Sequence, residues 1–300
     1  MNTATWAIIV TYQPDPALLA RLLASLAPQV TGGVVINNGQ SLPLTNAQLL
    51  EYGFHCQHLG HNAGIAAALN QGIQWCQAQG ATHIISFDQD SEPAADMVEC
   101  LQRAYQQLST QGHAIAAVGP CYEDRKTGEV APLLAADTHP DQYRKMMPAP
   151  ETGVVEVDML ITSGALMAVE VLDQIGPMRE ELFIDHVDME WCFRARHQGY
   201  AVYAVGDARL YHSIGDRVMK LLSRKILVHS PIRHYYMLRN GIALQRLPHM
   251  TSRWCRNMTL TLIKQFVFYS IFLPQRRQRI RLMLKGLYDG WRHHMGPLSQ

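Results

Sequence analysis

The chain has 300 residues, of which 48% are hydrophobic and 17% are charged. That length can bury a sizeable core, and that composition excludes a mainly disordered chain. The net charge of +1 excludes a uniformly basic or acidic protein. No basic and apolar leader follows Met1, so no secretory signal is predicted. The six cysteines form no Cys-x-x-Cys pair, and we interpret them as reduced thiols of a cytosolic protein.

Charge is unevenly distributed along the chain. Residues 217–300 contain 16 basic side chains and one acid, whereas residues 1–216 contain 10 basic and 24 acidic ones, so the two parts carry +15 and −14. The basic tail is also rich in aromatic residues, a mixture that suits an anionic membrane surface. A solvated basic helix face is the alternative. RNA would attract the same charge, but no RNA-binding motif is present, so nucleic acid is not a predicted partner.

The front of the chain alternates apolar runs typical of strands with segments of helical spacing. The predicted order is strand 6–11, helix 18–26, strand 34–36, strand 54–59, helix 64–78, strand 84–87, helix 93–108 and strand 114–119. This alternation predicts an α/β fold with a mainly parallel sheet and helices on both faces. Residues 121–154 show little periodicity and are predicted to form a long loop region. Structure is expected to resume at 155–169, and a helix is predicted at 185–198.

The tail, residues 217–300, is predicted to be a second, helical unit after a catalytic unit at 1–216. Its most apolar run, 258–273, ends before Pro274 and is short for a membrane span. One interpretation is an interfacial helix with basic residues at headgroup level, namely Arg276, Arg277, Arg279 and Arg281. A buried core helix is the alternative.

Polar loops follow three of the predicted strands, at the strand ends where open α/β sheets bind ligands. They are Thr11-Tyr12-Gln13-Pro14, Asn37-Asn38-Gly39 and Phe87-Asp88-Gln89-Asp90-Ser91. Asp88 and Asp90 place two carboxylates in one small volume, and Mg²⁺ binds one or two carboxylates together with phosphate oxygens. The alternative is an acidic turn in which Asp90 or Ser91 caps the following helix.

A second acidic cluster surrounds Trp191. Asp185 and Asp188 are three residues apart and are expected to share a helix face. A carboxylate in a partly apolar pocket has a raised pKa and makes a good general base. The alternative is a set of acids that favour the helix dipole, with Glu190 and Arg194 as an exposed pair. Farther on, His212 follows a predicted strand. It is either a metal ligand or an ordinary polar residue whose hydrogen bonds are satisfied within the protein.

Five motifs in this order resemble the large family of inverting, GT-A-fold glycosyltransferases often called family two. They are Thr11-Tyr12, Asn62-Ala-Gly64-Ile-Ala-x-Ala-Leu-Asn70-x-Gly72, Asp88-x-Asp90, Asp188-x-Glu190-Trp-x-x-Arg194 and His212. The run Asp-Gln-Asp-Ser is similar to that of the family's bacterial rhamnosyltransferases in particular. The resemblance covers about residues 6–215 and, more weakly, 233–240.

The resemblance implies roles for individual residues on the donor side of the site. Thr11 and Tyr12 would line the nucleotide base and ribose, and Asn62 and Gly64 would border the base. Asp88 would meet the ribose or a metal-bound water. Asp90 and His212 would ligate Mg²⁺ or Mn²⁺. The family usually has an acid that reads the base where this chain has Asn37, and an amide can also bond a pyrimidine.

On the acceptor side, the resemblance assigns Asp188 as the catalytic base. The acceptor would be shaped by Ser163, Gly164, Glu190 and Trp191. Candidates for gripping an acceptor diphosphate are Arg233, Tyr236, Arg239 and Asn240, for which ordinary helix surface and packing is the alternative.

The implied reaction is inverting transfer of L-rhamnose from dTDP-β-L-rhamnose to a hydroxyl of a saccharide acceptor. The acceptor is expected to be polyprenyl-diphosphate-linked, as in O-antigen and other cell-surface polysaccharide synthesis at the inner face of the cytoplasmic membrane. Alternatives are transfer of galactose, galactofuranose or glucose from a UDP-sugar, and a non-catalytic membrane-peripheral protein. A sugar nucleotidyltransferase would need a Gly-rich, basic loop after the first strand, which residues 11–14 do not form.

Overall fold

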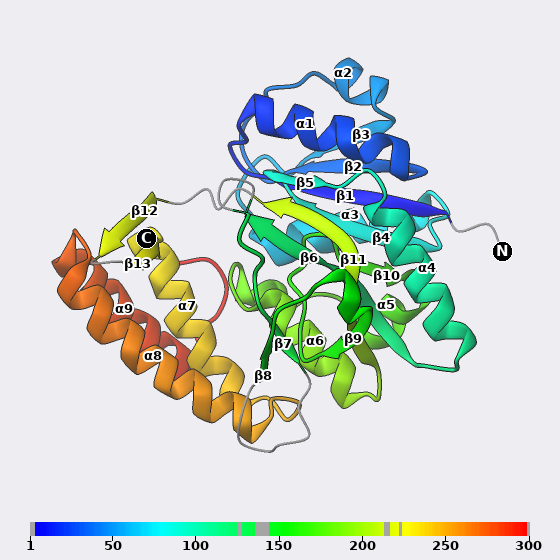
Figure 1. The fold of residues 1–300 in the computed structure, drawn as a ribbon. Helices are drawn as coiled ribbons and strands as arrows, with labels where there is room; N and C mark the ends of the chain where they lie inside the picture. The colour runs from blue at the N-terminus through cyan, green and yellow to red at the C-terminus, as the bar shows by residue number, and fades with distance from the viewer. Residues whose placement is uncertain (1–3, 125–127, 136–143, 213–216, 222–223, 299–300) are drawn as a thin grey trace.

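The computed structural model describes residues 4–124, 128–135, 144–212, 217–221 and 224–298 (Figure 1). β1 (Thr5–Thr11) pairs in parallel with β2 (Gly32–Asn37) on one side and with β4 (His83–Asp88) on the other. β3 (Phe54–His58) continues the sheet beyond β2, also in parallel. These four strands confirm the predicted ones, and their carboxyl ends lie at one edge of the sheet.

The second half of the sheet is mixed in direction. β10 (Leu166–Ala168) runs antiparallel between β4 and β6 (Ile115–Asp124), and β6 pairs in parallel with β11 (Ala201–His212). The sheet order among the described residues is β3-β2-β1-β4-β10-β6-β11-β9-β7-β8. The antiparallel members at this edge are β9 (Val154–Val157), β7 (Leu133–Ala135) and β8 (Arg144–Met146).

Both faces of the sheet are covered by helices, as predicted. Along β1, Ala7 and Ile9 point to one face while Ile8 and Val10 point to the other, because side chains alternate along a strand. The first face packs against α1 (Pro16–Leu26), α2 (Asn46–Glu51) and α4 (Met97–Thr110). The second packs against α3 (Ile65–Ala78), α5 (Val169–Ile175) and α6 (Val187–His197).

Three predictions for the front of the chain were wrong in detail. The region 121–154 is not one long loop, because β6 continues to Asp124 and β7 and β8 lie within it. The helix predicted from 93 begins at Met97, because Pro93 ends a short strand, β5 (Ser91–Pro93), that pairs antiparallel with β11. The helix predicted from 185 begins at Val187, so Asp185 precedes it and does not share a helix face with Asp188.

The tail begins with a β-hairpin rather than a helix, formed by β12 (Arg217–Leu221) and β13 (Arg224–Val228). Three helices follow: α7 (Pro231–Ala243), α8 (Ser252–Phe272) and α9 (Arg276–Arg292). α8 stops two residues before Pro274, as predicted. The helices share a small apolar core built on Leu238, Leu262 and Met283. No helix among the described residues is both long enough and apolar enough to cross a membrane.

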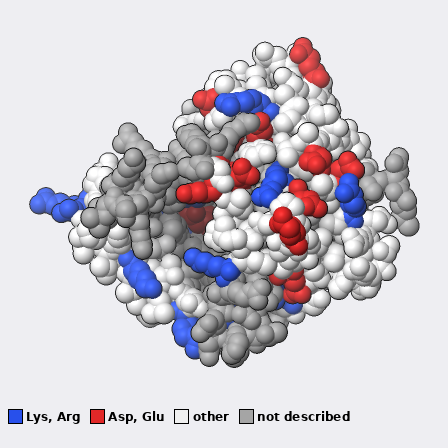
Figure 2. Space-filling view, viewed as in Figure 1, with Lys and Arg blue, Asp and Glu red and all other residues white. Residues whose placement is uncertain are grey.

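A buried ion pair fastens α8 to the sheet domain. Asp158 is 2% exposed and accepts from Arg196 at 2.5 Å and from Arg253 of α8 at 3.1 Å. Burial raises the pKa of Asp158, and the two guanidinium groups oppose that rise. On the face shown in Figure 2, Asp and Glu lie over the sheet domain together with several Lys and Arg, while the charged side chains visible over the helices at the left are Lys and Arg.

Candidate functional site

A cleft of about 590 Å³ opens at the carboxyl ends of β1, β2 and β4. Its walls come from the loops after these strands, from the N-terminus of α3, from the segment before α6 and from the start of α7. Seven predicted site residues line it: Tyr12, Asn62, Gly64, Asp88, Asp90, Asp188 and Arg233. The structure therefore brings together residues that lie up to 221 positions apart in the sequence.

On the donor side, Tyr12 is 48% exposed at the mouth of the cleft. The side chain of Gln89 holds the backbone of Tyr12 with two hydrogen bonds. Its Oε1 accepts from the Tyr12 N–H at 2.7 Å, and its Nε2 donates to the Tyr12 carbonyl at 3.2 Å. Gln89 lies between the two acids of the Asp-x-Asp motif, so it ties that motif to the loop after β1.

The polar wall of the cleft is built by Asn38 rather than by its neighbour Asn37. Asn38 donates from Nδ2 to Oδ1 of Asn62 at 3.2 Å and accepts from the Ala63 N–H at 2.7 Å. Asn37 is buried outside the cleft, where its Oδ1 accepts from the Gly39 N–H at 3.1 Å. Sequence reasoning singled out the strand's last residue and missed the next one, although side-chain alternation offered that signal.

Thr11, Ser163 and Gly164 lie beneath the cleft instead of in its wall. The Thr11 hydroxyl is buried and donates to the Ile36 carbonyl at 3.4 Å. Ser163 Oγ accepts from the backbone N–H of Asp88 at 3.1 Å and lies 2.7 Å from Ser91 Oγ. Gly164 has a φ of +81°, and a Cβ there would lie 2.6 Å from the Pro120 ring. Of the three, Ser163 supports the turn that carries the acids.

Asp88 and Asp90 face the cleft from the turn between β4 and β5. They offer carboxylate oxygens, the hard ligands that Mg²⁺ and Mn²⁺ accept. Among the described residues, no three His, Cys, Asp or Glu side chains converge as a ready-made metal site. The backbone pairing of β11 with β5 sets His212 opposite Ser91, beside this turn. The side chain of His212 lies outside the part of the chain that the structure describes.

Asp188 faces the cleft from the first turn of α6, opposite the Asp-x-Asp turn. Loss of water around the carboxyl, reinforced by the charges of Asp88 and Asp185, raises the pKa of Asp188 to about 6. A hydrogen bond from the Met189 N–H at 2.8 Å limits the rise. A carboxylate with that pKa is charged at neutral pH and is a stronger proton acceptor than an ordinary Asp.

The segment before Asp188 has an unusual backbone. Three of its residues have positive φ without being glycine, namely Phe183 at 65°, Asp185 at 63° and His186 at 64°. Such conformations cost free energy and persist only where neighbouring contacts hold them. All three residues line the cleft, so the strain lies at the candidate site.

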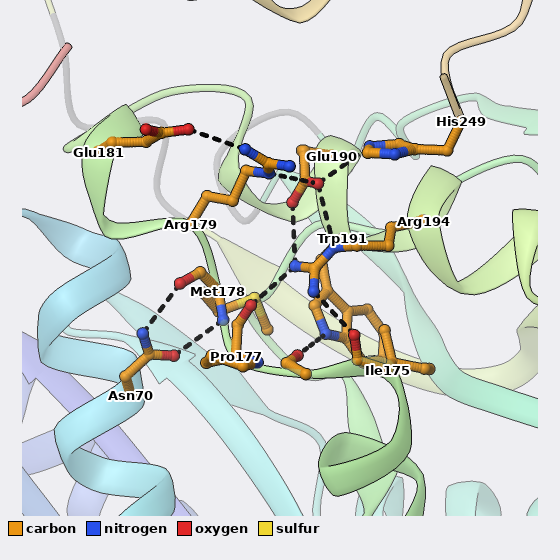
Figure 3. Close-up of polar contacts among 11 residues, drawn as sticks. Asn70, Ile175, Pro177, Met178, Arg179, Glu181, Glu190, Trp191, Arg194 and His249 are labelled. Atoms are coloured by element: carbon orange, nitrogen blue, oxygen red, sulfur yellow. Dashed lines mark hydrogen bonds and ion pairs between the residues drawn. The ribbon is translucent and has the colours of Figure 1, made fainter. Parts of the chain in front are cut away.

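The structure does not bring Glu190 and Trp191 to the cleft, where they were predicted to shape the acceptor side. Figure 3 shows Glu190 facing Arg179, Arg194 and His249. Its fully buried carboxylate lies 3.0 Å from Arg179 Nε, 3.1 Å from Arg194 Nε and 3.0 Å from His249 Nε2. Trp191 is 2% exposed and donates to the Gly176 carbonyl at 3.1 Å. Both residues hold α6 in place from the side of the helix that faces away from the cleft.

Of the tail residues predicted to bind a diphosphate, Arg233 reaches the cleft, whereas Tyr236 and Arg239 are buried away from it. Arg233 lines the cleft and pairs with Asp185 at 3.1 Å. Tyr236 is buried and stacks on Phe183, with ring centroids 4.9 Å apart. Arg239 is fully buried and bonds backbone carbonyls, so it is not placed to meet a diphosphate in the cleft.

The fold and the cleft define a glycosyltransferase. The model of glycosyl transferase family 2 matches residues 6–176, more than half of the chain, and the chain belongs to this family. This finding confirms the resemblance seen in the sequence. It also sets aside the nucleotidyltransferase alternative.

A relative and two solved structures place the chain further. It is 32% identical over 262 residues to the dTDP-rhamnosyl transferase RfbF of Shigella flexneri, covering 83% of this chain and 82% of that protein. The crystal structure of S. aureus TarS 1-349 aligns with a TM-score of 0.58 at 14% identity, over 95% of this chain and 80% of that one. GalNAc-T7 with UDP, GalNAc and Mn²⁺ aligns with a TM-score of 0.55 at 13% identity, over 90% and 58%. At 13% and 14% identity, the two solved structures show the fold alone.

Proposed function

We propose that this glycosyltransferase transfers L-rhamnose from dTDP-β-L-rhamnose, with inversion, to a hydroxyl of a lipid-linked saccharide. The observation that carries the mechanism is Asp188, a carboxylate with a raised pKa that faces two acids across one cleft. The choice of donor rests on the likeness to a dTDP-rhamnosyl transferase over most of both chains.

Asp188 accepts the proton of the acceptor hydroxyl while that oxygen attacks the anomeric carbon. The bond between the anomeric carbon and the diphosphate oxygen breaks on the opposite face, so a β-linked donor gives an α-linked product and dTDP leaves. This reaction needs a base for the nucleophile and charge stabilisation for the leaving group, but no covalent intermediate. The general base lies on α6, and the buried ion cluster around Glu190 holds this helix in place.

On the donor side, Tyr12, Asn38 and Asn62 bind the nucleoside through an exposed ring and an amide wall. Asp88, Asp90 and His212 would hold Mg²⁺ or Mn²⁺, which would supply positive charge for the diphosphate. His212 is opposite Ser91 in the pairing of β11 with β5, next to the turn that carries the two acids. Arg233 is the residue of the tail whose guanidinium lines the cleft and suits an acceptor phosphate.

We further propose that the protein works in the cytoplasm, bound peripherally to the inner face of the membrane. The exposed face of α8 repeats at helical spacing and is apolar, with Leu260, Ile263, Val267 and Ile271 each at least half exposed. Exposed Arg276, Arg277 and Arg281 follow in α9. Arg279, which was predicted to lie with them, is instead buried. An apolar helix face beside arginines suits the surface of an anionic bilayer. That location brings the cleft to a polyprenyl-diphosphate-linked acceptor.

The test is dTDP or UDP release by the purified protein with Mg²⁺ and a lipid-linked saccharide acceptor. The donors compared are dTDP-rhamnose, UDP-glucose, UDP-galactose and UDP-galactofuranose. We expect selective release of dTDP, and we expect an Asp90→Asn variant to lose the Mg²⁺-dependent part of its affinity for dTDP. Selective release of UDP would keep the transferase and overturn rhamnose.

A further inference from the structure

The strained segment 183–186 is held from the tail by one face of α7. Arg233 pairs with Asp185, and Tyr236 stacks on Phe183. Residue 240 lies on the same face, because positions 233, 236 and 240 follow the helical spacing of three and four. The segment that leads into Asp188 is therefore shaped by residues that arrive about fifty positions later in the sequence.

Asn240 makes the most concentrated of these contacts. Its Nδ2 lies 3.0 Å from the Leu182 carbonyl, 2.8 Å from the Ile184 carbonyl and 3.0 Å from the Asp185 carbonyl. Three carbonyls can converge on one amide nitrogen only when the backbone between them turns back on itself. The positive φ values of Phe183 and Asp185 produce that turn.

Arg239 completes the arrangement. Its Nε donates to Oδ1 of Asn240 at 2.9 Å, which fixes the amide so that the nitrogen faces the segment. Its Nη2 donates to the carbonyls of Glu181 at 3.1 Å and Leu182 at 2.8 Å. The side chains of Arg239 and Asn240 are both fully buried, where an unmade hydrogen bond is costly.

We propose that Asn240 and Arg239 are positioning residues for the general base. By bonding the carbonyls of residues 182–185, they hold the strained segment 183–186 in the conformation that directs Asp188 into the cleft. This inference rests on the proposed role of Asp188. It gives the tail a part in catalysis that is separate from membrane binding. A purely structural role would instead lower the stability of the fold without changing how the segment before α6 is ordered.

The test compares Asn240→Ser with Tyr235→Phe. The serine variant keeps a small polar group but loses the amide that spans three carbonyls. The control removes another buried hydrogen bond of α7, from the Tyr235 hydroxyl to Asp289 at 2.7 Å, and keeps the ring. Both variants are expected to unfold at a lower temperature than the wild type, so the comparison separates stability from positioning.

Two readouts are taken at a temperature where both variants are folded. Hydrogen exchange at the amides of residues 183–187 should be at least tenfold faster in Asn240→Ser and unchanged in Tyr235→Phe. With dTDP-rhamnose and acceptor, the kcat of Asn240→Ser should fall at least tenfold while the Kd for dTDP changes less than threefold. The control should keep kcat within twofold.

Wild-type exchange at residues 183–187 in Asn240→Ser would overturn the inference, as would an equal loss of kcat in both variants. Hydrogen exchange requires no substrate. If the wild type does not turn over dTDP-rhamnose, the choice of donor fails, while the exchange comparison still decides whether Asn240 orders the segment. Should Asn240→Ser not fold, Arg239→Lys, which retains the charge and loses the planar fork, is measured in the same way with the same two criteria.

Discussion

Ile65 donates its backbone N–H to the carbonyl of Phe183 across 2.7 Å. This bond joins the first residue of α3, beside the donor wall, to the strained segment before Asp188. Gly64 makes the approach possible, because its φ is +89° and a Cβ there would lie 2.6 Å from the same carbonyl oxygen. The two halves of the cleft therefore meet at one backbone contact.

Gly64→Ala is expected to weaken dTDP binding and to reduce turnover at least tenfold, because the added methyl pushes the Phe183 carbonyl away. Gly60→Ala is the matched control, since Gly60 has a φ of +75° but open space around its Cβ position. Isothermal titration with dTDP and rate measurements on both variants check the prediction. Equal effects in the two variants would mean that backbone strain alone, and not the Phe183 contact, is responsible.

Asp188→Asn is expected to abolish transfer, leave dTDP binding nearly intact and stabilise the protein. Burial raises the pKa of Asp188 from 3.8 to about 6, so the folded state resists its charge at neutral pH. A difference of two pKa units corresponds to about 2.7 kcal/mol. The gain in Tm should be full above pH 6, shrink as the pH falls from 6 to 3.8, and vanish below 3.8, where the wild-type carboxyl is protonated in both the folded and the unfolded state. Strong residual turnover in this variant would contradict the base assignment.

The activity of the wild-type enzyme should fall as the pH is lowered through about 6. Only the ionised form of Asp188 accepts a proton, and its pKa is about 6 because of burial and nearby acids. The measurement is kcat/KM between pH 4.5 and 8, with dTDP binding followed in parallel. An acid limb near pH 4 would point to a solvated carboxylate as the base.

Glu190→Gln is expected to destabilise the fold by about 3–5 kcal/mol, because it leaves the guanidinium groups of Arg179 and Arg194 without their buried partner. Glu99→Gln is the matched control. Glu99 and Arg103 form a pair with the same spacing as Glu190 and Arg194, but both side chains are more than two-thirds exposed, so their separation should barely change the free energy of unfolding. Chemical denaturation of both variants measures the difference. A Glu190→Gln variant as stable as the wild type would mean that this ion cluster contributes nothing to the stability of the fold.

The double variant Ile263→Asp, Val267→Asp should lose binding to anionic vesicles, because it places two charges in the exposed apolar face of α8. Leu50→Asp provides the control, since Leu50 is 52% exposed on α2 in the sheet domain. Sedimentation with vesicles of anionic phospholipid measures binding. Unchanged sedimentation of the double variant would exclude this face as the membrane contact.

The sheet and the donor side of the cleft were predictable from the sequence, for a physical reason. Parallel strands that are buried on both faces have apolar runs in their sequence, and their carboxyl ends lie at one edge of the sheet. Tyr12, Asp88 and Asp90 were found in this way. Gln89 was missed because its role depends on how two loops turn after their strands, which no local pattern fixes. Asn38 was missed although side-chain alternation distinguishes it from Asn37.

The acceptor side was less predictable because burial of charge cannot be read locally. Glu190 and Arg239 look like surface residues or ligand contacts in the sequence, since charged side chains are rarely buried. The Glu190–Arg194 pair is local and was predicted, but its burial depends on distant residues such as His249, and Arg239 bonds the distant carbonyl of Leu182. The hairpin at 217–228 was also missed, since its short strands carry basic residues in a region of helical composition.

The hydrogen bonds from Asn240 to residues 182–185 also set an order of events during synthesis. A ribosome adds residues from the N-terminus, so the donor wall and the Asp-x-Asp turn emerge long before α7 exists. Asp188 itself is made some fifty residues ahead of the side chain that holds its approach segment. A nascent chain would therefore be able to bind a nucleotide before Asp188 was oriented toward the cleft. The site would become complete only once the tail had left the ribosome. A chain that ends between residues 231 and 239 keeps the sheet and the donor wall but lacks Asn240, and we expect it to transfer nothing.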